Sequence, residues 1–153
     1  MMSTSPHRVA VSHAWLVVLI VLFEVKFENG VTLVGYRLAT DRLQPGESIR
    51  LVLYWQTDAP LGFDYNVFTH LLDPDGFLRG QQDNAPVGGT HPTSQWTTGE
   101  MIVDAYDIAL PADASTGAYS LEVGLYDWVT QAREQTVSRD DTVMLPATIQ
   151  VGN

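Results

Sequence analysis

Beyond residue 30 the chain repeats one pattern, in which short segments of alternating apolar and polar positions are separated by turn residues. Side chains of a β-strand point alternately to opposite faces, so this alternation predicts strands with one buried face. The clearest case is residues 49–56, with Ile49, Leu51, Leu53 and Trp55 on one face. Similar patterns predict strands at 31–39, 64–73, 101–110, 118–128, 133–137 and 142–151. No segment of this region keeps a 3.6-residue period long enough to predict a helix.

Turn signals between these segments favour antiparallel neighbours. Pro45-Gly46 joins a residue of fixed φ to one that adopts positive φ, and DPDG at 73–76 has the Pro and Gly positions of a hairpin turn. The longest link is GQQDNAPVGGTHPTSQW, residues 80–96. We expect it to be an ordered crossing between two sheets, because a loop of this length is either functional or well packed.

Many short strands with Gly and Pro turns and long crossings predict an all-β fold, an antiparallel β-sandwich of jelly-roll or Greek-key, Ig-like type. The length of 153 residues is that of one domain with a sizeable core. We therefore assign residues 27–153 to the β-sandwich domain. Residues 1–26 are assigned to a short apolar N-terminal segment.

This N-terminal segment contains an apolar run at 14–23. Ten residues rise about 15 Å as a helix, about half the thickness of a bilayer core. The run has the length of a secretory h-region, although Glu24, Val25 and Lys26 follow where small residues normally mark cleavage. We expect a signal-like segment or the remnant of a membrane span, which would be the chain's contact with a membrane. A buried β-strand is the alternative, because VVLIV is rich in β-branched residues.

Composition narrows the function classes. The chain is 45% hydrophobic and 17% charged, as globular proteins are. Its 8 basic and 18 acidic residues give a net charge of -10, which opposes binding to nucleic acid. The chain has no cysteine, so a disulfide framework, a thiolate nucleophile and a zinc–cysteine site are excluded.

Acidic residues near the expected hairpin are candidate metal ligands. Asp73, Asp75 and Asp83 offer carboxylate oxygens to a structural calcium, which takes six to eight oxygen ligands. No EF-hand spacing is present. The alternative is turn chemistry, in which the Asp73 side chain accepts a backbone N–H two residues on. The sequence predicts no cofactor apart from this candidate structural calcium.

Candidate ligand-binding residues gather in the 80–96 link and at one strand end, and they are Asp83, His91, Thr93, Trp96 and Trp128. Tryptophan faces stack on sugar rings, and the polar residues hydrogen-bond hydroxyl groups. The alternative for a tryptophan that closes a loop is packing.

His70 or His91 could form a hydrolytic pair with Asp83 or Ser94, which would be an acid/base site. Neither a G-x-S-x-G elbow nor an H-E-x-x-H motif occurs, and a histidine within a strand is usually a packing residue. We therefore predict no catalytic residues and no enzymatic activity.

Four segments together carry a family resemblance, and they are GVTLVGYRL (30–38), PGESIRLVLYWQT (45–57), DYNVFTHLLDPDG (64–76) and the stretch from QQDNAP to WVTQAR (81–133), which includes PTSQWTTGEMIVD (92–104). Over about residues 27–152 the chain resembles the C-terminal extracytoplasmic β-sandwich domain of Chloroflexi-type, family 39-like (dolichyl-phosphate-mannose-type) membrane glycosyltransferases and related envelope proteins. The resemblance implies an extracytoplasmic, non-catalytic accessory module, secreted or anchored to the envelope. It assigns no catalytic residue.

Three functions follow from these observations. The first is a β-sandwich module that binds glycan or supports a neighbouring membrane glycosyltransferase. The second is a structural or assembly module of the cell envelope that acts through its sheet edges without a small ligand. The third is a hydrolase dependent on Asp and His. The sequence does not predict an oligomeric state.

Overall fold

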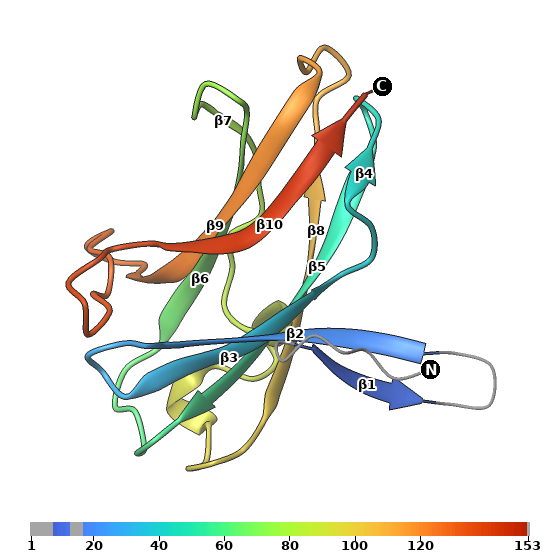
Figure 1. The fold of residues 1–153 in the computed structure, drawn as a ribbon. Helices are drawn as coiled ribbons and strands as arrows, with labels where there is room; N and C mark the ends of the chain where they lie inside the picture. The colour runs from blue at the N-terminus through green and yellow to red at the C-terminus, as the bar shows by residue number, and fades with distance from the viewer. Residues whose placement is uncertain (1–7, 13–16, 153) are drawn as a thin grey trace.

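The structure is a computed structural model that describes residues 8–12 and 17–152 (Figure 1). Within these residues the chain forms strands and two short 3-10 helices, and no α-helix. In chain order the elements are β1 (Arg8–Ser12), β2 (Val17–Lys26), β3 (Val31–Leu38), β4 (Arg42–Leu43), β5 (Ser48–Thr57), β6 (Tyr65–Leu72), β7 (Leu78–Gln81), η1 (Val87–Gly89), η2 (Thr93–Gln95), β8 (Ile102–Ala109), β9 (Gly117–Asp127) and β10 (Val143–Val151).

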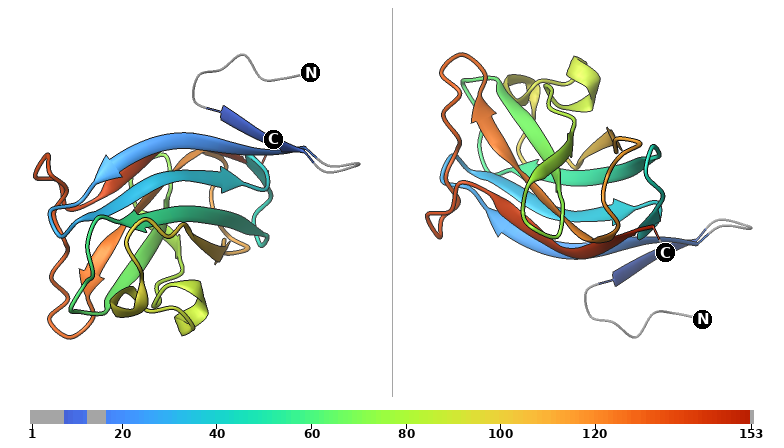
Figure 2. Two further views of the ribbon diagram at one scale, coloured as in Figure 1. Left: turned by 90° about the horizontal axis from the view of Figure 1, so that it is seen from below. Right: turned by 90° about the horizontal axis from the view of Figure 1, so that it is seen from above.

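Two five-stranded sheets pack face to face (Figure 2). The strand order is β1-β2-β3-β5-β8 in the first sheet and β4-β10-β9-β6-β7 in the second. The pairings described are antiparallel except that of β4 with β10, which is parallel and involves two residues of each strand. The prediction of an all-β, antiparallel β-sandwich is therefore confirmed. A strand of two residues is too short for alternation to reveal, so β4 was not predicted.

The facing sides of the two sheets form the core. The first sheet contributes Ile49, Leu51, Leu53 and Trp55 from β5, all fully buried. The second sheet contributes Tyr119, Leu121, Val123 and Leu125 from β9, which are buried to the same degree. Burying one such side chain contributes about 1.5–3 kcal/mol, so the predicted alternation accounts for much of what holds the sheets together.

The N-terminal apolar run contributes a strand to the first sheet. β2 pairs with β3 through Val21 opposite Tyr36 and Lys26 opposite Thr32. The domain boundary expected after residue 26 would therefore separate β2 from its partner β3. Residues 17–26 form a β-strand, as the alternative interpretation of the apolar run predicts. The beginning of the run, residues 14–16, lies outside the described residues. In the part of the chain that is described, no helix has the length and apolar character needed to cross a bilayer.

The link after β7 carries the chain from the second sheet to the first, which confirms the expected crossing. Its path is held by buried contacts. Val87 has φ 56°, unusual for a β-branched residue, and its N–H donates to the buried carboxylate of Asp104 at 2.8 Å. Trp96 is buried, and its indole N–H donates to the carbonyl of His91 at 2.9 Å.

The expected strand at 133–137 does not form. Arg133 and Thr136 make isolated bridges instead of a ladder. The backbone hydrogen bonds of the segment are divided between two neighbours, because the N–H of Glu134 donates to the carbonyl of Leu125 and the N–H of Val137 donates to the carbonyl of Lys26. The segment therefore connects the ends of β9 and β2 instead of pairing along one strand.

Candidate functional site

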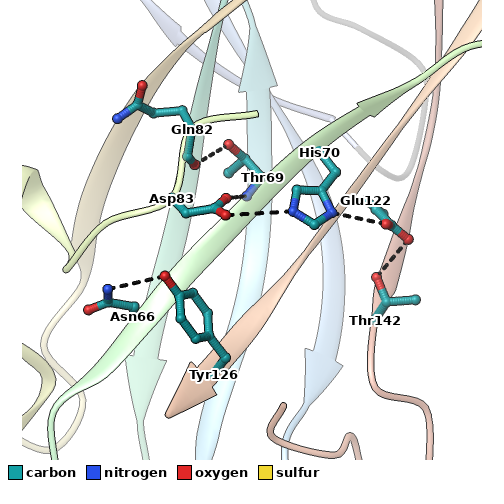
Figure 3. Close-up of polar contacts among 8 residues, drawn as sticks. All are labelled: Asn66, Thr69, His70, Gln82, Asp83, Glu122, Tyr126 and Thr142. Atoms are coloured by element: carbon teal, nitrogen blue, oxygen red, sulfur yellow. Dashed lines mark hydrogen bonds and ion pairs between the residues drawn. The ribbon is translucent and has the colours of Figure 1, made fainter. Parts of the chain in front are cut away.

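A polar cluster lies on the outer face of the second sheet, where β6 and β9 are neighbours (Figure 3). The register places Asn66 opposite Tyr126, Phe68 opposite Gly124, and His70 opposite Glu122. The intervening residues Val67 and Leu71 belong to the core. Because successive side chains of a strand alternate, the three opposing pairs face away from the core.

His70 lies at the centre of the cluster, between two carboxylates (Figure 3). Its Nδ1 is 3.1 Å from Oε1 of Glu122, and its Nε2 is 3.7 Å from Oδ2 of Asp83. The remaining carboxylate oxygens are also engaged. The backbone N–H of Thr69 donates to Oδ1 of Asp83, and the hydroxyl of Thr142 donates to Oε2 of Glu122, each at 3.1 Å. His70 thereby connects β6, β9, the 80–96 link and the segment that precedes β10.

This geometry favours the doubly protonated ring. A carboxylate only accepts hydrogen bonds, so Nδ1 of His70 must carry a proton to bond Glu122. A proton on Nε2 turns its contact with Asp83 from repulsion into attraction. Burial lowers the pKa of His70, but the hydrogen bonds and negative charges of Asp83 and Glu122 outweigh burial, and the pKa is raised above its ordinary value.

An aromatic ring forms the floor of the cluster. Phe68 is buried although it is on the outer face, because its ring lies on Gly124 and beneath the guanidinium of Arg133. The guanidinium carbon is 4.3 Å from the ring centroid, a cation–π distance. A Cβ on residue 124 would collide with the Phe68 ring, so glycine is needed there.

Six residues line a small open cavity above this floor, and they are Phe68, His70, Asp83, Tyr126, Gln131 and Arg133. We call it the His70 hollow, and its volume is about 130 Å³. The Tyr126 hydroxyl accepts a hydrogen bond from the Asn66 amide at 3.3 Å, which orients the tyrosine at the rim (Figure 3). The hollow thus combines hydrogen-bond acceptors, donors and the rings of Phe68 and Tyr126 within a single surface depression.

A tight turn after β9 carries an exposed tryptophan, and its backbone is hydrogen-bonded to a residue of the hollow. The carboxylate of Asp127 accepts the backbone N–H groups of Val129 and Thr130 at 2.8 and 3.2 Å. Gln131, which lines the hollow, donates its amide to the carbonyl of Trp128 at 2.9 Å. The Trp128 side chain is 54% exposed. The turn that follows β9 therefore exposes this indole to solvent, and its backbone is tied to the hollow through Gln131.

Of the ligand-binding residues expected from sequence, the structure brings Asp83 into the hollow. Trp128 does not line the hollow, and its backbone carbonyl accepts the amide of Gln131. His91 does not line the hollow, and its Nε2 is 3.1 Å from a carboxylate oxygen of Glu100. Glu100 also accepts the backbone N–H of Thr97, and this bond is the main cause that lowers the pKa of Glu100. His91 therefore belongs to a second, smaller polar group on the link.

Two expected ligand-binding residues are buried, which corrects the sequence expectation. Thr93 is fully buried, and its hydroxyl donates to the carbonyl of Phe63 and accepts the N–H of Tyr65. Trp96 is 3% exposed and packs in the core cluster. The hydroxyl of Thr93 holds the link to the beginning of β6, and the ring of Trp96 packs in the core. Neither side chain is therefore open to a ligand.

The expected calcium ligands are not brought together. Among the described residues, no three His, Asp or Glu side chains are grouped so as to hold a metal ion. Oδ1 of Asp73 accepts the backbone N–H groups of Asp75 and Phe77 at 2.9 and 3.0 Å, as the turn alternative predicts. Asp83 lies in the His70 hollow instead. A calcium site built from Asp73, Asp75 and Asp83 therefore does not fit this structure.

Most of the hollow is not predicted by the sequence. His70 is expected from sequence to be a packing residue, with a hydrolytic pair as the alternative, and Glu122, Tyr126, Gln131 and Arg133 are not singled out. One signal was available, because Glu122 and Tyr126 are two positions either side of Gly124 and so share the face opposite the core residues. The register between β6 and β9 places His70 opposite Glu122, and the sequence of neither strand by itself predicts this register.

A larger opening lies elsewhere, between β2–β3 and β10. It measures about 320 Å³ and is lined largely by aliphatic residues, with Tyr36 and Asp41 among the others. The convergence of polar groups at the His70 hollow makes the smaller cavity the better candidate for specific recognition.

Comparison with known proteins bears on the fold alone. No protein-family model and no curated protein matches the chain. The C-terminal domain of Wzt is similar in structure, with a TM-score of 0.51 and 14% identity over 97% of this chain and 80% of that chain. The CARDB domain of a Pyrococcus furiosus protein, solved in complex with di-metal ions, has a TM-score of 0.45 and 12% identity over 86% of this chain and 96% of that one. The likeness to the Wzt domain extends over nearly the whole chain, and at this identity it establishes a shared β-sandwich fold.

Proposed function

We propose that this chain is a non-catalytic β-sandwich module that binds carbohydrate on the outer face of its second sheet. The observation that carries the proposal is the His70 hollow, in which charged and polar side chains converge around an aromatic floor on a sheet face that points away from the core. Small-ligand sites are concave and combine apolar walls with a few convergent polar groups.

The side chains of the hollow suit the chemistry of sugars. Each sugar hydroxyl both donates and accepts hydrogen bonds. Asp83 supplies acceptors, His70 and Gln131 supply donors, and the Tyr126 hydroxyl is both. The exposed indole of Trp128 adds a flat apolar surface for the C–H face of a sugar ring. A neutral polyol is the ligand class that uses all of these groups.

The same geometry supports a binding role without catalysis. A histidine that acts as general base needs a free lone pair on one ring nitrogen. Both ring nitrogens of His70 face carboxylate oxygens, which favours the imidazolium without a lone pair. The sequence resemblance over about residues 27–152 points in the same direction, toward an accessory module.

The proposed setting is extracytoplasmic, beside a membrane glycosyltransferase whose product or substrate the module would hold. This part rests on the sequence resemblance of segments 30–38, 45–57, 64–76 and 81–133. Fractionation of the native cells, followed by detection with an antibody, tests it. Recovery of the protein with the envelope or the medium is expected, and recovery with the cytoplasm would contradict it.

Isothermal titration calorimetry with soluble oligosaccharides of mannose, glucose, galactose and N-acetylglucosamine tests the binding function. We expect heat with at least one sugar, and affinity about tenfold lower for Asp83→Asn because a charged acceptor is removed. Asp107→Asn is the matched control, since Asp107 pairs with Arg50 on the outer face of the other sheet. Absence of heat with every sugar, or equal loss in both variants, would contradict the proposal.

A second candidate function, assembly through a sheet edge, is favoured by β8. This strand is at the edge of the first sheet and exposes Val103, which is 54% exposed. Met101, which immediately precedes the strand, is 46% exposed. An exposed apolar edge can accept a strand from another chain. Light scattering across a dilution series tests this function, with Val103→Lys expected to dissociate any oligomer. A monomer at all concentrations would rule out self-assembly through this edge.

A further inference from the structure

One ring nitrogen of His70 and one carboxylate oxygen of Asp83 face each other in the His70 hollow without a direct hydrogen bond between them. Nδ1 of His70 is used by Glu122, and Oδ1 of Asp83 is used by the backbone N–H of Thr69. The opposite atoms, Nε2 of His70 and Oδ2 of Asp83, are 3.7 Å apart. This separation exceeds the length of a direct hydrogen bond, so the ion pair is open to a bridging group.

A hydroxyl group complements this pair. The oxygen of the hydroxyl accepts a hydrogen bond from the Nε2–H of the imidazolium, and its O–H donates a hydrogen bond to Oδ2 of Asp83. A second hydroxyl on the neighbouring carbon would be within the same depression, where Tyr126 and Gln131 offer further polar groups. Neighbouring hydroxyls are what sugars present and what a hollow of about 130 Å³ can admit.

The charges around the hollow select against anionic sugars. Arg133 is the arginine that lines it, and its guanidinium is held over Phe68 and lies 3.7 Å from the carboxylate of Asp141. Asp83 and Glu122 flank His70 on both sides. The imidazolium and Arg133 balance Asp83 and Glu122, and Asp141 leaves one net negative local charge. The chain as a whole carries -10, so both the local and the overall charge disfavour a carboxylate or phosphate on the ligand.

We propose that the His70 hollow binds neighbouring hydroxyl groups of an uncharged sugar, and that it does so while His70 is an imidazolium. This inference rests on the proposed carbohydrate-binding function and specifies the ligand class and protonation state of the same site.

Loss of the His70 proton changes the site in a defined way. The charged groups that face the imidazole are Glu122 from β9 and Asp83 from the link, and Arg133 reaches the Phe68 ring that lies 4.8 Å from the imidazole centroid. Nδ1 keeps its proton for Glu122, so Nε2 is the nitrogen that loses one. Nε2 and Oδ2 of Asp83 are then both acceptors, and one hydroxyl proton cannot serve both. Binding should therefore weaken as pH rises through the titration of His70.

Amide chemical-shift mapping of the full chain by NMR tests this inference. The uncharged probes are the methyl glycosides of mannose, glucose and galactose, and the anionic probes are glucuronate and galacturonate. We expect an uncharged probe to shift amides around His70 and Asp83 at about pH 5.5, with affinity about tenfold lower at about pH 9. The uronates should bind more weakly than the corresponding neutral sugars.

Two variants separate this inference from other sites. His70→Gln keeps a polar side chain but should abolish the pH dependence and reduce affinity about tenfold. Asp83→Asn provides a second test if His70→Gln does not fold, as judged by amide dispersion. His91→Gln alters the histidine outside the hollow and should bind as the unmodified chain does.

The outcomes are distinguishable. Shifts that map elsewhere, uronates that bind as well as neutral sugars, or equal affinity at both pH values would overturn this inference and leave the proposed function standing. Absence of shifts with every probe would overturn this inference and, together with absence of heat in the calorimetric panel, the proposed function as well.

Discussion

The indole N–H of Trp55 donates a hydrogen bond to the buried carboxylate of Asp104 at 3.1 Å. Both side chains are fully buried between the sheets, and Oδ1 of Asp104 accepts the N–H of Val87 at 2.8 Å. Burial raises the pKa of Asp104, and the hydrogen bonds that it accepts offset part of this rise. One carboxylate thus joins β5 and β8 to the link and holds Val87 at its positive φ.

Asp104→Ala should lower the free energy of unfolding by about 3 kcal/mol, because two buried donors lose their acceptor. Asp104→Asn should cost less, since its amide oxygen still serves one donor. Urea denaturation measures both. Asp107→Ala, on the exposed face of the same strand, is the control and should cost much less. Equal losses at residues 104 and 107 would contradict the buried role.

The stabilising contribution of His70 should depend on pH. Its folded pKa is raised by Asp83 and Glu122, so the contribution is fully present below the unfolded pKa and is lost as pH rises through the folded pKa. The difference in free energy of unfolding between the unmodified chain and His70→Gln should therefore shrink as pH rises from about 5 to about 9. Urea denaturation at a series of pH values measures it. A difference that grows with pH would refute this assignment.

Gly124→Ala should destabilise the protein by about 1–3 kcal/mol, because the added methyl group collides with the Phe68 ring. Displacing the ring also removes the surface on which Arg133 lies. Gly62→Ala is the matched control, since no atom lies within 4 Å of the added Cβ, and it should change stability by about 0.5 kcal/mol or less. Thermal melts compare the two, and similar melting temperatures would count against the packing described.

Trp96 and Trp128 should respond in opposite ways to truncation. Trp96→Ala removes a core side chain and should cost about 3–5 kcal/mol. Trp128→Ala removes an indole that is 54% exposed and should change stability by about 0.5 kcal/mol or less, while weakening sugar binding if the ring stacks on the ligand. Denaturation and calorimetry of both variants measure these effects. A large stability loss at Trp128 would show a packing role instead.

The local pattern of the sequence was sufficient for the fold class and for most of the longer strands after residue 30. Alternation in β5 and β9 predicted which side chains are buried, because a strand's period of two is a property of the backbone alone. The hairpin at 73–76 and the crossing after β7 were predicted from turn residues. The strand predicted at 133–137 was wrong because the backbone hydrogen bonds of this segment are divided between Leu125 and Lys26, and such contacts between distant residues carry no local signal.

The candidate site depended on tertiary structure. His70 and Glu122 are 52 residues apart, and only the β6–β9 register brings them to 3.1 Å. Asp83 was predicted as a ligand residue from its loop, but its place beside His70 follows from how the link folds back on β6. Thr93 and Trp96 look equally accessible in sequence, yet they are buried because the link packs on the sandwich. The sequence alone determined which residues face the core, since that depends on local periodicity, whereas strand register and loop packing decided which polar residues meet, since these depend on contacts between distant segments.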